Sequence, residues 1–220
     1  MARFVVVIVF SLALILATQF SYAFENGDFQ YWNTESAETK LIGKYKVKVE
    51  EEFRFGDGLG TFYYNHTDVG IKYPISKSID LSLNYRQIFE RQSDDDWDTE
   101  YRPHLNTTFK WKVKDAQIDN RSRLEFRIKE SGDNKWRLRH KLTFLLPFKW
   151  TEYNIQPYVA DEVFVHLYDI AINRNRLYVG FKAKILKNLK GEIYYLTQIT
   201  KGDSNWTNYN VLGTKLKIAF

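Results

Sequence analysis

Hydrophobic and polar residues alternate along this chain from about residue 29 to its end, in runs of roughly 10–14 residues. In the run 121–130, for example, the odd positions are charged and most of the even positions are apolar. Because side chains two apart on a strand share a face, each run predicts a strand with one apolar and one polar face. No segment after residue 28 shows the 3.6-residue period of an amphipathic helix, so the pattern predicts an all-β fold.

The runs predict eleven strands, joined alternately by short Lys-flanked turns and by longer Gly-, Asp- and Asn-rich loops. Bacterial single-chain membrane barrels have even strand numbers, so we expect 10–12 strands. Twelve is favoured, since Phe24–Gln30 could form a short extra strand, and ten would follow if the first run does not span the membrane. The eleven runs cover residues 29–41, 45–55, 61–73, 79–91, 100–113, 118–130, 135–146, 153–167, 174–186, 190–200 and 207–220.

Residues 1–23 have the pattern of a cleaved signal peptide for Sec-type export. Arg3 supplies a positive charge, Phe4–Ala17 is an almost unbroken apolar run, and Ser21-Tyr22-Ala23 is a small-x-small cleavage site. We expect cleavage after Ala23 and a single domain over 24–220; the alternative is an N-terminal membrane anchor. The chain contains no cysteine, which excludes disulfides and thiolate chemistry.

Three all-β architectures fit alternating strands: a β-sandwich, a soluble lipocalin-like barrel that binds a ligand, and a transmembrane barrel with its apolar face outside. The predicted strands are long enough to cross a bilayer, which takes about 9–11 residues, and their polar faces are continuously charged. Tyr and Trp, which favour the lipid–water interface, gather near the ends of the runs, at Tyr73, Trp97, Tyr101, Trp136, Trp150, Tyr153 and Trp206. We therefore expect an antiparallel, up-and-down transmembrane β-barrel.

The last run ends on Leu216, Ile218 and Phe220, all on one face. A closing strand of this kind is similar to the C-terminal assembly signal of bacterial outer-membrane barrels. We therefore expect the bacterial outer membrane as the location, with membrane lipid, lipopolysaccharide and the barrel assembly machinery as partners. Lys215 and Lys217 should then point into the lumen.

Four short motifs resemble the domain-of-unknown-function family 2490: Asp28-Phe29-Gln30-Tyr31-Trp32, Glu52–Gly56, Pro157–Glu162 and Asn173–Gly180. The family is described as bacterial outer-membrane barrels, and the resemblance covers nearly the whole mature chain. It implies a location and a fold. It implies no activity, because no chemistry is assigned to the family.

The most informative candidate site consists of Glu162 and the polar faces of three runs, 118–130, 135–146 and 174–186. In one interpretation their charges form cross-strand ladders that fill a narrow barrel. In the other, the excess of Arg makes a constriction that selects anions, and the barrel is a narrow, weakly anion-preferring pore. The candidate lumen residues are Arg121, Arg123, Glu125, Arg127, Arg137, Arg139, Lys141, Glu162, Arg174 and Arg176.

The main alternative function is an outer-membrane lipid-modifying hydrolase. Such an enzyme needs a nucleophile or metal-bound water beside a base, and no histidine lies in a recognised catalytic motif. His66 and His104 should face the lumen, and His140 falls on an apolar face. His166, near Asp161, Glu162 and Asp169, is the best acid–base cluster. We expect no catalytic residue and no enzyme activity.

The sequence predicts no cofactor, metal or nucleic-acid partner. Asp94, Asp95, Asp96 and Asp98 form an acidic loop that lacks the Gly and distal Glu of a calcium loop, so a solvated loop is favoured over a cation site. The formal net charge is +5, and the Lys and Arg residues are largely spaced along the strands. A nucleic-acid-binding patch would instead have them clustered on one surface.

Overall fold

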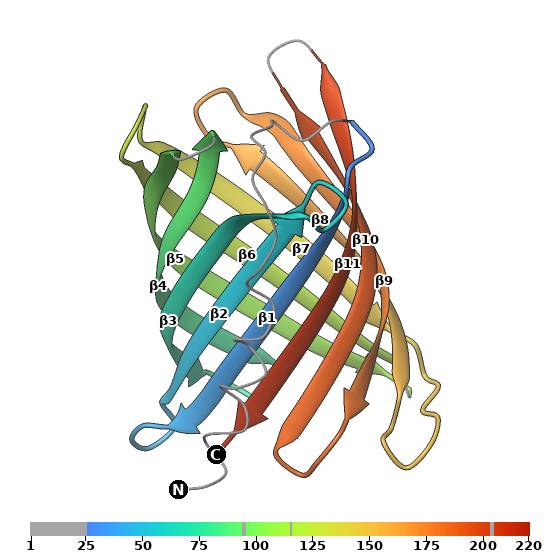
Figure 1. Ribbon diagram of the computed structural model, residues 1–220. Coiled ribbons are helices and arrows are strands. Elements are labelled where there is room, and N and C mark those ends of the chain that lie inside the picture. Colours follow the sequence, from blue (N-terminus) through green and yellow to red (C-terminus); the bar gives the residue numbers. More distant parts are fainter. Residues whose placement is uncertain (1–25, 94–95, 115, 203–204) are drawn as a thin grey trace, which may run out of the picture.

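The computed structural model describes residues 26–93, 96–114, 116–202 and 205–220, and the expected signal peptide lies outside them. Within these residues eleven strands close into a barrel (Figure 1), and no helix is long and apolar enough to cross a membrane. The strands follow the eleven predicted runs closely. They are β1 (Phe29–Lys40), β2 (Lys46–Gly56), β3 (Thr61–Pro74), β4 (Ile79–Ser93), β5 (Asp96–Val113), β6 (Ala116–Lys129), β7 (Lys135–Leu145), β8 (Gln156–His166), β9 (Ala171–Lys184), β10 (Leu189–Lys201) and β11 (Trp206–Ala219).

The barrel closes through a parallel pair, β1 with β11, from Phe29 opposite Asn210 to Glu38 opposite Ala219. All other neighbouring strands are antiparallel. Two predictions are therefore wrong, the favoured count of twelve and the purely antiparallel sheet. Each strand crosses the barrel once, so an odd number leaves the last strand running in the direction of the first. Residues 26–28 precede β1 without forming an extra strand, and residues 24–25 lie outside the described part.

The connections alternate between two ends of the barrel (Figure 1). We call the end at which β1 begins, the upper end in Figure 1, the N-terminal rim. It carries the links β2–β3, β4–β5, β6–β7, β8–β9 and β10–β11. The C-terminal rim holds Phe220 and the other links. The sequence predicts longer loops at one rim than at the other, and this prediction is wrong. At the N-terminal rim, for example, the predicted loop 168–173 is shortened, because β9 already begins at Ala171. The β7–β8 link over 146–155, predicted as a short turn, instead forms a small hairpin with a bridge between Trp150 and Ile155.

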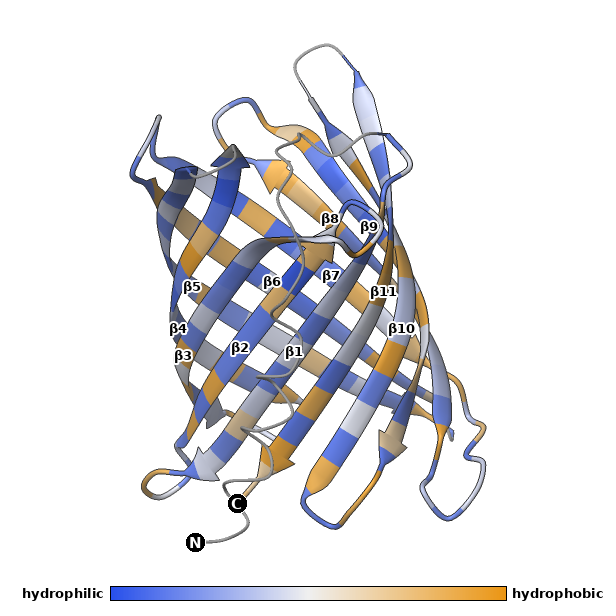
Figure 2. Ribbon diagram, viewed as in Figure 1, coloured by the Kyte–Doolittle hydropathy of each residue, from blue (hydrophilic) through white to orange (hydrophobic). Residues whose placement is uncertain are grey.

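The apolar face of the sheet points outward and the charged face points inward, as predicted. In β9, Leu177 and Val179 are 60% and 52% exposed, whereas Arg176 and Tyr178, which alternate with them, are 5% and 4% exposed. Figure 2 shows the same alternation as orange and blue bands along the strands. Inside the barrel, buried apolar side chains form two small clusters, one of Tyr63, Tyr64 and Ile88 and the other of Trp32, Leu145, Tyr158, Ala160, Tyr178, Tyr194, Leu196 and Val211.

Candidate functional site

Glu125 of β6 lies in the ion network that fills the barrel, and its side chain is fully buried. Arg137 and Arg139 of β7 donate hydrogen bonds to its two carboxylate oxygens at 2.6 and 2.8 Å. Arg123, two residues away on β6, lies 3.4 Å from the same carboxylate. A buried carboxylate needs cations and donors to replace its lost hydration. Three guanidinium groups do so here.

Glu162 of β8 is the second buried carboxylate of this network. Arg121 and Arg139 donate to one of its oxygens at 2.9 and 2.8 Å. The Tyr178 hydroxyl donates to the other oxygen at 2.8 Å, and Arg176 lies 3.8 Å from it. Arg139 therefore bridges Glu125 and Glu162, and it links the neighbouring strands β6, β7 and β8 on the inner wall of the barrel.

The candidate lumen residues all point into the barrel, but they do not form one cluster. Arg127 pairs instead with Glu100 of β5, to which it donates two hydrogen bonds at 2.7 and 2.8 Å. Arg102 donates to the same carboxylate. The structural interpretation, that Arg and Glu form cross-strand ladders, accounts for these paired residues.

Lys141 and Arg174 are not explained by ladders, because neither has an ion pair within the described ranges. The Lys141 ammonium lies 3.4 Å from the centre of the Tyr178 ring. The Arg174 guanidinium lies 5.6 Å from the ring of Phe164, and its Nε has no hydrogen-bond partner. These two cations are free to attract an anion from the lumen.

Phe164, an inward-facing aromatic residue of β8, narrows the lumen toward the N-terminal rim and is 1% exposed. Four guanidinium groups lie 4.6–5.6 Å from its ring centre, those of Arg137, Arg139, Arg174 and Arg176. Arg176 also lies 4.7 Å from the Trp32 ring, which Arg54 approaches from β2 at 3.8 Å. Cation–π contacts thus join opposite walls of the barrel at this level.

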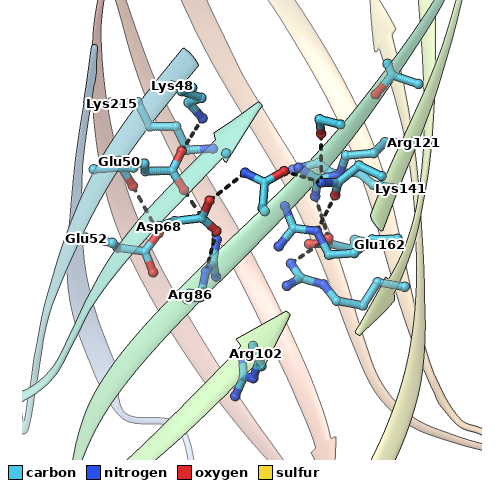
Figure 3. Close-up of a pocket in the computed structure, with 18 of the residues that line it drawn as sticks. Lys48, Glu50, Glu52, Asp68, Arg86, Arg102, Arg121, Lys141, Glu162 and Lys215 are labelled. Atoms are coloured by element: carbon cyan, nitrogen blue, oxygen red, sulfur yellow. Dashed lines mark hydrogen bonds and ion pairs between the residues drawn. The ribbon is translucent and has the colours of Figure 1, made fainter. Parts of the chain in front are cut away.

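Glu50, Glu52 and Asp68 form an acidic wall on β2 and β3. It lies across the barrel from the Arg and Lys side chains of β6 and β7 (Figure 3), and it was not predicted from the sequence. Arg86 of β4 donates to Asp68 at 2.8 Å, and Thr34 donates to Glu52 at 3.0 Å. The alternation in β2 and β3 already places these carboxylates on the polar face. Only the closure of the barrel shows that these carboxylates face the Arg side chains of β6 and β7.

The lumen keeps a cavity of about 400 Å³, which is lined in the described residues by sixteen Lys and Arg and seven Asp and Glu. Glu100 and Glu125, which pair with Arg residues of this lining, are not part of it and bring the carboxylates to nine. The cationic excess therefore persists after the acidic wall and these partners are included. A second hollow of about 200 Å³ lies toward the C-terminal rim. The arrangement therefore presents a net positive charge to the cavity.

The histidines lie in three separate surroundings: the lumen, the outer wall and the end of β8. His66 and His104 are buried in the lumen, 3.5 Å from Glu50 and 3.4 Å from Asp68. His140 faces outward, as predicted, and its Nδ1 lies 3.1 Å from the Ser122 hydroxyl.

Of the acid–base cluster predicted around His166, only Asp169 acts electrostatically on the imidazole. His166 bonds to Asn173 at 2.9 Å, and Asp161 faces the outer wall, where Asn175 donates to it at 2.8 Å. Glu162 belongs to the lumen network instead.

The remaining sequence candidates lie at the strand ends. Asp94 and Asp95 lie outside the described residues, and Asp96 and Asp98 begin β5 instead of a loop. No group of three or more His, Asp or Glu is arranged to hold a metal within the described ranges. Leu216 and Phe220 are exposed on the outer wall, while Lys215 and Lys217 line the lumen.

Comparison with known proteins gives the chain a family but no activity. No curated protein matches it in sequence. A family model described as "Protein of unknown function (DUF2490)" matches residues 29–210, from the start of β1 into β11. The resemblance found in the four short motifs is thereby confirmed, and the chain belongs to this family.

Proposed function

We propose that this protein is a bacterial outer-membrane β-barrel, exported by its N-terminal segment. The observation that carries the proposal is the polarity of the sheet, with Leu, Val, Ile and aromatic side chains outside and ion pairs inside. A soluble lipocalin-like barrel has the opposite polarity, since water surrounds it. In lipid, outward apolar side chains are favourable and a closed barrel leaves no strand edge without hydrogen bonds.

Aromatic residues near the rims support the same location. Trp97, Trp136 and Trp206 are exposed toward the N-terminal rim, and Trp111 and Trp150 toward the C-terminal rim. Indole rings favour the interface because the ring is apolar and the N–H is polar. Exposed Trp residues toward both rims therefore support a barrel that crosses a bilayer from one surface to the other.

The proposed role is a narrow pore that conducts weakly and prefers anions, with no enzymatic activity and no cofactor. The ion network and the four Arg residues around Phe164 occupy part of the lumen, which supports weak conduction. The cationic excess and the unpaired Lys141 and Arg174 support the preference for anions.

Membrane fractionation with heat-modifiable gel mobility tests the location. A lipid-embedded barrel should fractionate with the outer membrane and migrate differently before and after boiling. Recovery in the soluble fraction would instead favour the lipocalin-like alternative.

Planar-bilayer recordings test the role. The reversal potential should show anion preference, and Arg174→Gln should reduce it without removing the partner of any carboxylate. Arg137→Ser with Arg139→Ser is a less clean test, because it also removes two of the three guanidinium partners of Glu125 and one partner of Glu162. Clear cation preference in the unaltered protein would contradict the proposal.

A lipid-labelled hydrolysis assay tests the hydrolase alternative. The unaltered protein should show no turnover. Turnover that is lost in His140→Ala or His166→Ala would overturn the non-enzymatic proposal.

A further inference from the structure

The smaller hollow, toward the C-terminal rim, has an excess of positive charge in its lining. Four cations border it, against two carboxylates. Its lining comprises Thr108, Asp119, Arg121, Lys141, Thr143, Tyr158, Lys182, Glu192 and Lys215. The side chains come from seven consecutive strands, β5 to β11, so the hollow is a convergent site and not one strand's solvated face.

The two carboxylates of this hollow already have partners. Tyr158 donates to Glu192 at 2.6 Å, and the Lys215 ammonium lies 3.4 Å from the same carboxylate. Asp119 accepts a hydrogen bond from Gln117 at 2.7 Å. These two negative charges offset at most two of the four cations that border the hollow.

Lys141 and Lys182 are the two cations of the hollow that have no described carboxylate at ion-pair distance. Their ammonium groups lie 3.4 Å from the Tyr178 ring and 4.8 Å from the Tyr158 ring, and neither forms an ion pair with a described residue. An enclosed ammonium without a counter-charge is unfavourable. An anion placed between them would remove that cost.

Three of the cations and one hydroxyl residue are shared by the two hollows: Arg121, Lys141, Lys215 and Thr108. An anion in the smaller hollow can therefore enter from the main cavity, and it meets point charges from Lys and the planar fork of Arg. Lys and Arg together with hydroxyl donors are the groups that bind phosphate and carboxylate oxygens in proteins.

We propose that this hollow binds a multivalent oxyanion, of the kind carried by phosphate or polycarboxylate compounds. The inference rests on the proposed anion-preferring lumen and adds the class of ligand. Four convergent cations, two of them unpaired, favour a ligand with more than one negative charge over chloride.

The test uses the whole barrel, purified in a non-ionic detergent and free of oxyanion buffers. Its thermal unfolding is followed by tryptophan fluorescence, with pyrophosphate, citrate or chloride added at matched ionic strength. Pyrophosphate or citrate should raise the unfolding midpoint saturably, and whichever acts at lower concentration distinguishes a phosphate from a carboxylate ligand. Chloride should have no saturable effect.

Lys141→Gln and Lys182→Gln should each weaken the oxyanion's affinity by about tenfold or more, as expected for losing a charged contact. Neither change deprives a carboxylate of its partner, so both variants should keep the heat-modifiable mobility of the folded barrel. Lys110→Gln is the matched control: Lys110 lines only the main cavity, pairs with Asp80, and should retain full affinity.

An equal response to chloride, or equal affinities for the three variants, would overturn the site. These measurements involve no membrane, so they are independent of conductance. Saturable binding without ion conduction would support the site and count against the pore. Anion-preferring conduction without saturable binding would do the reverse.

Discussion

At the residue scale, the lumen contains two kinds of cation that the sequence does not distinguish. Arg139 and Lys141 are two apart on β7 and share a face, yet Arg139 bridges two carboxylates and Lys141 meets an aromatic ring. The difference comes from neighbours on β6, β8 and β9, which alternation along one strand does not specify. Sequence reasoning therefore predicts that a side chain faces the lumen but not its partner.

Replacing Arg139 with Gln should destabilise the barrel strongly. Glu125 and Glu162 would each lose a cation while staying buried, which costs about 3 kcal/mol even though Arg137 and Arg121 remain. Urea unfolding of the detergent-solubilised protein measures this loss. Arg174→Gln is the control and should change stability far less, because no carboxylate depends on it; equal losses in the two variants would contradict this account of the network.

Glu35 and Glu51 face each other directly on the outer wall of β1 and β2, and neither forms an ion pair in the described part of the chain. Like charges opposite each other on neighbouring strands destabilise a sheet, so Glu51→Gln should raise the free energy of unfolding by about 0.2–1 kcal/mol. Glu38→Gln, on the inward face of β1, should lower it instead, because Glu38 pairs with Lys72 and Lys217 at 2.6 and 3.0 Å. A shift of the same sign in both variants would contradict the assigned faces.

At the element scale, period-2 alternation was sufficient to predict the strands. In a closed barrel every strand has one inner and one outer face, so the same signal recurs in each. It does not record which strands pair, and the parallel seam and the acidic wall were missed for that reason. The 146–155 link was also mispredicted, since its Trp150–Ile155 hairpin depends on local hydrogen bonds and not on hydrophobic period.

Gly213 of β11 makes room for an aromatic ring on the next strand. A Cβ at this position would collide with the Tyr194 ring, so Gly213→Ala should displace that ring from the inner cluster and lower the unfolding midpoint. Gly191→Ala is the control, because its Cβ would meet only the flexible end of Ile185, 2.8 Å away. Equal effects of the two changes on thermal unfolding would exclude a specific role for the Gly213–Tyr194 contact.

The C-terminal strand is expected to guide assembly. Deleting Phe220, or changing it to Asp, should reduce the amount of inserted barrel far more than Lys217→Ser. Phe220 follows the last residue of β11, at the rim, where the direct cost of a charge facing lipid is only about 0–1 kcal/mol. A large loss would therefore point to recognition during assembly. Normal outer-membrane levels of the deletion variant, measured by immunoblot of fractions, would contradict the assembly signal.

At the scale of the whole molecule, the odd number of strands places the start of β1 and the end of β11 at opposite rims. β1 starts at the N-terminal rim and β11 ends at the C-terminal rim, so Asn26 and Phe220 lie at opposite ends of the barrel (Figure 1). An even-numbered antiparallel barrel would bring both ends to the same side. The parity of the strand count therefore becomes a question of which segments share a side of the membrane.

Epitope accessibility in intact cells tests this parity. One epitope is placed after Asn26, a second in the β8–β9 link at 167–170, and a third in the 146–155 link, which avoids disturbing Phe220. The first two share the N-terminal rim and should behave alike, both exposed or both protected, whereas the third should show the opposite behaviour. Because the β8–β9 and β7–β8 links are separated by one strand in any barrel of this sheet, they calibrate the two sides. If the Asn26 epitope instead behaved like the one in 146–155, an even number of strands would cross the membrane and the parallel closure by β1 and β11 would be wrong.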